Sequence, residues 1–265
     1  MTTRYFSHLA ISGDQVRLDG PEAHHLLHVM RAEIGAKVVL FDGEGSEFLA
    51  EVVGVGRGEV ELAVLTQEKV DRELSTELTI GVALPKGDRQ KWLVEKLVEL
   101  GVTRLVPLVT ERSVAKPLPA ALERLQRTVI EASKQCGRNR LMEIAGPQLW
   151  PELVDVSSGI EHRWLAHPAR GNAAGDSTVA GTLPVPSAQS GGGSGRHTEC
   201  ACYFTGPTTP APVLLAIGPE GGFTDAEVGL ATIAGWQCVD LGPRILRVET
   251  AALLLVSWTL LGLGA

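Results

Sequence analysis

The amino-acid sequence predicts an α/β protein made of a small β-rich domain and a larger domain built on a parallel sheet. Up to about residue 72, short apolar or alternating segments are separated by glycine-containing turns, which is the pattern of a compact β-barrel. From Thr79 onward, strand-like segments alternate with helical ones, as in a parallel sheet covered by helices on both faces. We therefore expect one domain at 1–72 and a second at 73–265.

The first domain is expected to contain one helix among its strands. Pro21 begins a helical pattern and Gly35 ends it, because proline is favoured in the first turn of a helix and glycine just beyond the last. The polar stretch at 69–74 is the expected linker to the second domain.

The second domain is expected to alternate between strands and helices to its end. Its strands are predicted at 77–86, 102–111, 163–167, 212–218 and 237–242. Its helices are predicted at 88–101, 120–137 and 224–236, and a last apolar helix ends the chain. Asp88 is a predicted N-cap and Gly101 a predicted stop, while Thr224 and Glu227 have the spacing of a capping box.

One segment of the second domain does not fit this alternation. Residues 171–212 are rich in Gly, Ser, Thr, Pro and Ala, with GGGSG at 191–195. Such a composition offers too little apolar surface to offset the entropy of ordering the chain. We expect a disordered insertion between two core strands.

Composition and charge narrow the classes of function. The chain has 265 residues, is 44% hydrophobic and carries a formal net charge of −7, which argues against binding nucleic acid or membrane through bulk charge. The segment 104–140 is nevertheless rich in Lys and Arg, either as a solvated helix face or as a local basic face. The N-terminus lacks an apolar signal core, and the apolar run at 251–265 is shorter than the roughly 20 residues of a membrane span. We expect a cytoplasmic protein that does not enter membranes.

Three loops are the candidate ligand site. Ligands of open α/β sheets bind beyond the carboxyl ends of the strands, where the loops 165–169, 217–223 and 241–247 follow predicted strands. Glycines let the backbone approach a ligand closely, and prolines hold a loop in shape before binding. One Gly-Pro loop alone is more simply a structural turn, but two at corresponding positions favour a site.

Other motifs are absent or incomplete. No phosphate loop GxxxxGK(S/T) occurs, and no GxGxxG follows the first strand of the second domain, which weakens nucleotide triphosphate and dinucleotide hypotheses. His24 and His28 have metalloprotease spacing, but the position after His24 is His25 instead of glutamate. Cys200 and Cys202 lie in the insertion without partner ligands. We expect no metal site.

Four segments resemble one known family. They are EAHHLLHVMR at 22–31, SKQCGRNR at 133–140, IGPEGGFTDAEV at 217–228 and LGPRILRVETAAL at 241–253. Together they are similar to the RsmE-type ribosomal RNA uridine-N3 methyltransferases of the SPOUT superfamily, over nearly the whole chain except the insertion. The resemblance implies a PUA-like β-barrel followed by a SPOUT α/β domain with a C-terminal trefoil knot. It also implies S-adenosyl-L-methionine as methyl donor, a homodimer, and a uridine of 16S ribosomal RNA, naked or in the assembled small subunit, as substrate.

The resemblance also implies the site residues. By match of motif, the cofactor-binding residues are Leu165, His167, Ile217, Gly218, Pro219, Glu220, Gly221, Gly222, Leu241, Gly242, Arg244, Ile245 and Leu246. The expected RNA-binding residues are Arg4, Arg31, Lys134, Gln135, Arg138, Asn139 and Arg140.

Arg247 and Glu249 are the expected catalytic residues, at the mouth of the site. Transfer of a methyl group to uridine N3 requires loss of the imide proton, so an arginine near the uracil carbonyls would stabilise the anion. A carboxylate could accept the proton or hold that arginine. For Glu249, a salt bridge that pins the loop is an equally open interpretation.

Two other functions remain open. A SPOUT enzyme could act on a ribose 2′-hydroxyl of transfer RNA, although the N-terminal domain and the QCGRNR segment favour ribosomal RNA. A non-catalytic RNA-binding protein could keep the same fold, but such a protein has no use for intact cofactor loops.

Overall fold

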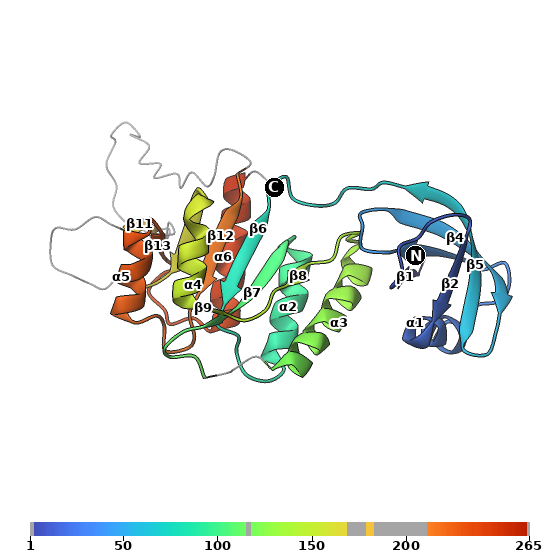
Figure 1. Cartoon of the computed structure of the whole chain (residues 1–265), viewed down its shortest axis with the longest axis horizontal. Helices are drawn as coiled ribbons and strands as arrows, with labels where there is room; N and C mark the ends of the chain where they lie inside the picture. The colour runs from blue at the N-terminus through green and yellow to red at the C-terminus, as the bar shows by residue number, and fades with distance from the viewer. Residues whose placement is uncertain (1–2, 115–117, 169–178, 183–210, 264–265) are drawn as a thin grey trace, which may run out of the picture. The chain divides into compact units, whose positions relative to one another are not determined.

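The computed structural model describes residues 3–114, 118–168, 179–182 and 211–263 and divides the chain into two compact units (Figure 1). The first unit comprises residues 1–73 together with 123–142, and the second comprises 74–122 together with 143–265. The first segment of the first unit therefore ends close to the predicted boundary at residue 72. Residues 123–142, which carry the basic SKQCGRNR segment, belong to the first unit, although the sequence assigns them to the second domain.

The first unit is built on a five-stranded sheet in the order β1-β3-β4-β5-β2. Its strands are β1 (Arg4–Phe6), β2 (Gln15–Asp19), β3 (Lys37–Phe41), β4 (Glu47–Val55) and β5 (Glu59–Glu68). β1 and β3 are parallel, and the remaining neighbours are antiparallel. Buried and less buried residues alternate along most of β4, as the period of two in a strand requires. The curled sheet encloses a core that includes Tyr5, Leu40, Phe48 and Leu62.

The helix predicted between Pro21 and Gly35 is shorter than expected. α1 (Gly20–His24) continues directly into a π-helical turn (His25–Val29), and helical structure ends there. Beyond this turn, the Ala32 N–H donates to the Leu26 carbonyl at 3.1 Å, and the Gly35 N–H donates to the Val52 carbonyl of β4 at 2.8 Å. One local bond and one long-range bond thus satisfy these backbone N–H groups in place of further helical turns.

The second unit contains a sheet in which every paired strand is parallel, and this confirms the predicted architecture. Its order is β11-β13-β10-β12-β6-β7-β8, with β9 paired to β7. The strands are β6 (Leu78–Val82), β7 (Arg104–Val109), β8 (Glu143–Ile144), β9 (Gln148–Leu149), β10 (His162–Ala166), β11 (Val179–Thr182), β12 (Val213–Ile217) and β13 (Gln237–Asp240).

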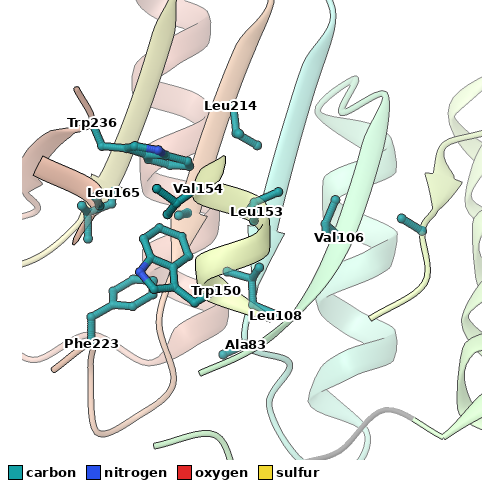
Figure 2. Close-up of a cluster of buried hydrophobic side chains, with 13 residues drawn as sticks. Ala83, Val106, Leu108, Trp150, Leu153, Val154, Leu165, Leu214, Phe223 and Trp236 are labelled. Carbon is teal, nitrogen blue, oxygen red and sulfur yellow. The ribbon is translucent and has the colours of Figure 1, made fainter. Parts of the chain in front are cut away.

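Helices cover both faces of this sheet. Besides α1, the α-helices of the described residues are α2 (Arg89–Glu99), α3 (Pro119–Cys136), α4 (Trp150–Val156), α5 (Asp225–Ile233) and α6 (Val248–Leu263), and α3 belongs mostly to the first unit. In Figure 2, α4 lies in front of the strands, while α2 and α6 lie behind them. α4 is absent from the sequence prediction, because a seven-residue helix is too short to show a clear period.

Of the helix signals predicted in the second domain, all but one agree with the structure. Thr224 and Glu227 form the expected capping box, in which the Thr224 N–H donates to Glu227 Oε2 at 2.8 Å. Gly101 follows the end of α2 with a φ of +83°, a left-handed conformation that favours glycine. Asp88 precedes α2 but makes no side-chain capping bond, because its own backbone is already helical.

An aromatic cluster joins α4 to the loop after β12 (Figure 2). The ring of Trp150 lies 4.6 Å from that of Phe223 and 5.2 Å from that of Trp236, measured between centroids. Trp150 Nε1 donates to the Glu227 carbonyl at 3.0 Å, and Trp236 Nε1 donates to Ser157 Oγ at 3.1 Å. Phe223 is 2% exposed, so the end of the 217–223 loop is part of the core.

The predicted insertion at 171–212 lies mostly outside the described residues. Within it, residues 179–182 form β11 and pair with β13 at the edge of the sheet, which differs from the expected disorder. An edge strand offers unpaired backbone groups to any neighbouring segment, and β13 supplies such an edge.

Candidate functional site

The carboxyl ends of three parallel strands bring the three predicted loops to one edge of the second unit's sheet. Ala166 of β10 lies beside Ile217 of β12 on one side and Val239 of β13 on the other. Backbone bonds extend this alignment beyond the strands, since the His167 N–H donates to the Val239 carbonyl at 3.0 Å. The predicted loops 165–169, 217–223 and 241–247 are therefore neighbours, apart from Ala169, which lies outside the described residues.

The second loop is a rigid turn closed by its own backbone. Ile217, Gly218 and Pro219 are buried, and the Gly222 N–H donates to the Pro219 carbonyl at 2.7 Å. A Cβ at Gly218 would lie 3.0 Å from a ring carbon of Phe223, so packing of the loop on the core requires glycine there.

The turn of the second loop faces open space. Glu220 and Gly221 are exposed, and Gly222 has a φ of +67° with no atom within 4 Å of the place of a Cβ. Arg112 Nη1 donates to the Gly221 carbonyl at 2.7 Å, which holds the turn to the segment after β7.

The third loop presents side chains to solvent immediately before α6. The Gly242 N–H donates to Asp240 Oδ1 at 2.9 Å, and Gly242 has a φ of +105° with open space beside it. Ile245 is 98% exposed, so nearly all of its apolar side chain is open to solvent or to a ligand. The remaining residues of the loop are exposed or half-buried: Leu241, Arg244, Leu246 and Arg247.

Glu249 differs from Arg247 in its surroundings. It is 7% exposed, and its Oε2 finds no hydrogen-bond donor among the described residues. Arg247 is exposed, and its carbonyl accepts the first helical hydrogen bond of α6 from the Ala251 N–H at 2.9 Å. Of the two expected catalytic residues, one is thus a sheltered carboxylate with a free oxygen and the other an exposed cation.

Arg89 is a site residue that the sequence prediction missed. Its Nη1 lies 3.6 Å from Glu249 Oε1, and its Nη2 lies 3.3 Å from Glu220 Oε1. It therefore links the second loop to α6. A sequence signal exists in retrospect: Arg89 is the first residue of α2, where a positive charge is opposed by the helix dipole and needs a compensating partner.

Carboxylates of the first unit neutralise much of the predicted basic face. Arg138 is 4% exposed, and its Nη2 contacts Glu73 Oε2 at 2.5 Å. Lys134 Nζ lies 2.8 Å from Glu22 Oε1, and Arg4 Nη1 lies 2.8 Å from Glu47 Oε2. Arg138 is therefore not part of a solvated helix face, because its charge is paired inside the unit.

Asn139 and Glu47 form the centre of this polar network. Asn139 is 2% exposed, accepts a bond from Arg4 Nη2 at 2.6 Å and donates to the Val70 carbonyl at 3.1 Å. Burial by itself would raise the pKa of Glu47, but hydrogen bonds and positive charges from Arg72 and Arg4 outweigh it and hold that pKa below its ordinary value. The network ties the end of α3 to the sheet of the first unit.

The exposed members of the predicted RNA-binding set are Arg31, Gln135 and Arg140. Arg31 has a φ of +52° just beyond the π-helical turn. The guanidinium of Arg140 lies over Gly45, where a Cβ would come within 3.2 Å of it. These two arginines remain available to phosphate groups.

Two general features complete the description of the site. Among the described residues, no group of three His, Cys, Asp or Glu side chains could hold a metal ion. Within the same residues, every helix is too short or too polar to cross a membrane.

Two family models match the chain. The model of an RNA methyltransferase domain matches residues 72–260, and that of an RNA methyltransferase PUA domain matches residues 18–65. The first match spans the parallel sheet with all three loops, and the second spans much of the curled sheet.

Relatives in sequence carry one name. Ribosomal RNA small subunit methyltransferase E of Synechocystis is 34% identical over 236 residues, which cover 89% of this chain and 69% of the relative. The protein of the same name from Bacillus subtilis is 28% identical over 247 residues, or 91% of this chain and 87% of the relative.

Solved structures resemble the whole chain. A putative methyltransferase of Legionella pneumophila in complex with S-adenosylmethionine has a TM-score of 0.81 and 28% identity, with 98% of each chain covered. The ribosomal RNA small subunit methyltransferase E of Neisseria gonorrhoeae, bound to S-adenosylmethionine, has a TM-score of 0.78, 28% identity and the same coverage.

Proposed function

This chain belongs to the RNA methyltransferase family of RsmE type, and we propose that it transfers a methyl group from S-adenosyl-L-methionine to N3 of a uridine in 16S ribosomal RNA. The observation that carries the proposal is the meeting of three glycine- and proline-containing loops at the carboxyl edge of a parallel sheet. The names of the relatives and of the Neisseria gonorrhoeae structure support the class of reaction and its substrate.

The cofactor would be held mainly by loop backbone. Gly222 and Gly242 both turn with positive φ and leave open space beside the main chain, which fits close approach of a ligand. The exposed Ile245 and the half-buried Leu246 are apolar side chains that an adenine ring or the aliphatic chain of the cofactor's methionine part could cover. We assign the remaining contacts to the residues that the family resemblance implies: Leu165, His167, Ile217, Gly218, Pro219, Glu220, Gly221, Leu241 and Arg244.

Residues of the chain would accept the imide proton of uracil and stabilise the negative charge that develops on the base. S-adenosylmethionine supplies an electrophilic methyl group, so the protein must orient the uracil and remove its imide proton. The free Oε2 of Glu249 is a suitable acceptor, and the exposed guanidinium of Arg247 could contact the uracil carbonyls as negative charge develops. Arg89 would position Glu249 through its ion pair.

The first unit would bind RNA. A base within structured RNA must be splayed out to reach an active site, so the rest of the RNA has to be held elsewhere. We propose that Arg31 and Arg140 contact phosphates, while Arg4, Lys134, Arg138 and Asn139 shape the surface on which the RNA lies, with Gln135 at its rim. Since its substrate would be ribosomal RNA, we expect the enzyme to work in the cytoplasm.

We also propose a C-terminal trefoil knot. The chain leaves β13, which lies beyond β10, and returns through the third loop to α6, which packs against α2 and β12. This return past β10 is compatible with threading of α6 through an earlier loop, an exception to ordinary chain topology.

A homodimer is the expected assembly. α6 consists mostly of apolar residues, unlike a helix that has one face in solvent. Nevertheless, Leu261 is 79% exposed, and Leu253 and Leu254 are only partly buried. A second copy of the chain would cover such a surface.

The test is methyl transfer by purified protein. Small ribosomal subunits and naked 16S RNA from a strain without the modification would be incubated with methyl-labelled S-adenosylmethionine, and the labelled nucleotide identified. We expect one labelled N3-methyluridine. Label on a transfer RNA ribose, offered in parallel, would support the first alternative. Cofactor binding without transfer to any of the RNAs would contradict the proposal, and absence of cofactor binding would favour an RNA-binding protein.

A further inference from the structure

The first unit contains an open pocket whose lining includes three of the predicted RNA-binding residues, but no predicted role says what the pocket itself would bind. It has a volume of about 340 Å³, within the range of roughly 300–1,000 Å³ that is usual for ligand sites. Its lining comes from the chain around β1, from α1 and the π-helical turn, and from α3: Thr3, Arg4, Pro21, Glu22, His25, Glu131, Lys134 and Gln135. All of these residues belong to the first unit.

Two of the lining residues carry buried polar atoms with unmet hydrogen bonds. Among the described residues, neither Arg4 Nε nor His25 Nδ1 finds a partner. Buried polar groups are nearly always paired in folded proteins, so unpaired ones mark places where a ligand or water completes the set. Two residues of the pocket wall therefore carry hydrogen-bonding capacity that the described residues do not use, although both atoms are buried behind the pocket surface.

The imidazole of His25, which lines the pocket, packs against the buried ring of Tyr5. The imidazole of His25 lies 5.8 Å from the ring of Tyr5, and Lys134 Nζ lies 5.9 Å from the centre of that ring. Burial, followed by the negative charge of Glu22, raises the pKa of Tyr5 to about 12, so its phenol stays protonated and neutral. A flat imidazole in the lining is a surface on which an unstacked base can lie.

The charges of the pocket are already balanced. Lys134 Nζ lies 2.8 Å from Glu22 Oε1 and 3.2 Å from Glu131 Oε1, while Arg4 is paired with Glu47. A phosphate would have to displace these carboxylates and would meet their repulsion. A neutral ring with polar edges would not.

The hydrogen-bond donors and acceptors of the pocket favour some nucleobases over others. Carboxylate oxygens of Glu22 and Glu131 can accept hydrogen bonds from an amino group, and Lys134 and Arg4 can donate to a carbonyl oxygen. Guanine and cytosine carry both an exocyclic amino group and a carbonyl. Uracil lacks the amino group, and adenine lacks the carbonyl.

We propose that this pocket binds an unpaired guanine or cytosine of the RNA substrate, other than the methylated nucleotide. The inference deepens the proposed function and rests on it, because it takes the substrate to be RNA. The base lies against His25, its amino group faces the carboxylates, and its carbonyl faces Lys134 and Arg4. The first unit then recognises a base identity in addition to the RNA backbone.

The experiment uses the full chain and four labelled oligouridine 12-mers, each with one central guanine, cytosine, adenine or uracil. Fluorescence anisotropy measures their affinity. We expect the guanine or the cytosine oligonucleotide to bind about tenfold more tightly than the uracil one, as for one well-formed base contact. His25→Ala and Glu131→Gln should remove this preference, while the affinity for all-uridine RNA stays the same.

Glu123→Gln is the matched control, because Glu123 is an exposed glutamate of α3 outside the pocket. Equal affinity of wild-type protein for all four oligonucleotides would overturn the proposal, as would an equal loss of preference in the control. A preference that His25→Ala and Glu131→Gln both retain would place base recognition elsewhere and also overturn it. Melting temperatures would verify that each variant is folded.

Methylation of intact small subunits by the wild-type protein separates the two proposals. If methylation occurs without any base preference, the pocket proposal alone fails. If the base preference is present but no subunit is methylated, the proposed function alone fails.

Discussion

Arg247 is an exposed cation of the candidate site, and two roles for it would have different effects on the kinetics. If it stabilises charge on the uracil, Arg247→Ala should reduce kcat about a hundredfold, because contacts made only in the transition state act on turnover. Arg247→Lys should recover little, since an ammonium cannot reproduce the guanidinium fork. Single-turnover methylation with saturating RNA and S-adenosylmethionine measures the effect. A near wild-type rate in Arg247→Ala would restrict the residue to shaping the loop.

Arg89 lies between the carboxylates of Glu220 and Glu249 and should act through them. Arg89→Ala removes the cation beside a carboxylate that is 7% exposed, so Glu249 loses its orientation. We expect kcat to fall about tenfold or more, with partial rescue in Arg89→Lys, because one cation can still reach one carboxylate. Lys91→Ala, on the exposed side of α2, is the control. Loss of stability with unchanged kcat would indicate a purely structural role.

The lowered pKa of Glu47 predicts that the stability of the first unit depends on pH. Its pKa is lowered in the folded state, so its contribution to stability is present above the unfolded pKa and is lost as the pH falls through the folded pKa. Glu47→Gln should therefore reduce the free energy of unfolding at pH 7 by about 1 kcal/mol, after allowance for partial solvent screening, and lower the melting temperature accordingly. The difference in melting temperature between Glu47→Gln and wild type should shrink as the pH falls below 4.5, the ordinary pKa of a glutamate.

The control for this effect is Glu44→Gln, which changes an exposed carboxylate of the neighbouring turn. A destabilisation by Glu47→Gln that stays constant down to pH 3.5 would mean that packing, and not charge, is responsible.

At the scale of elements, substitutions of different glycines in the second and third loops test core packing and cofactor binding separately. Gly218→Ala places a methyl group 3.0 Å from the Phe223 ring, so it should lower the melting temperature. In Gly222→Ala and Gly242→Ala the added methyl group has no atom within 4 Å, but the alanine must adopt a positive φ, which destabilises the fold by about 1 kcal/mol each. We expect these two to weaken S-adenosylmethionine binding in calorimetry with a smaller change in melting temperature.

Gly229 provides the comparison, because it lies in α5 with no atom near the place of a Cβ. Gly229→Ala should stabilise the protein by roughly 0.5–1 kcal/mol and leave cofactor binding unchanged. If Gly222→Ala and Gly242→Ala bound the cofactor like wild type, the proposed backbone site would be wrong.

At the scale of the whole molecule, the expected homodimer should depend on α6. Light scattering should give about twice the chain mass of 28.2 kDa at micromolar concentration. Leu261→Glu should shift the protein toward the monomer, because a charge would be buried against the partner. Ile233→Glu, which changes an equally exposed apolar residue of α5, should not. A wild-type protein that stays monomeric would refute the assembly.

Local sequence patterns determined much of the architecture. The alternation of strands and helices predicts a parallel sheet, and the carboxyl ends of its strands place three loops on one edge, as observed. The capping box of Thr224 and Glu227 was also predictable, because its two residues are only three positions apart. Such features depend on contacts within one element or on rules that all parallel sheets obey.

The tertiary structure alone decided which charges meet. Arg138 is 65 positions from Glu73, and Arg89 is 131 positions from Glu220, so no local pattern reports either pair. For the same reason, the sequence leaves open whether the basic segment at 133–140 is a solvated face or a local basic face, whereas folding places Arg138 against Glu73 and Asn139 against the Val70 carbonyl, both in the stretch after β5. A sequence shows which side chains are charged, but only the fold determines how far each charge lies from water and from its partners, and this distance decides whether it binds a ligand or the protein itself.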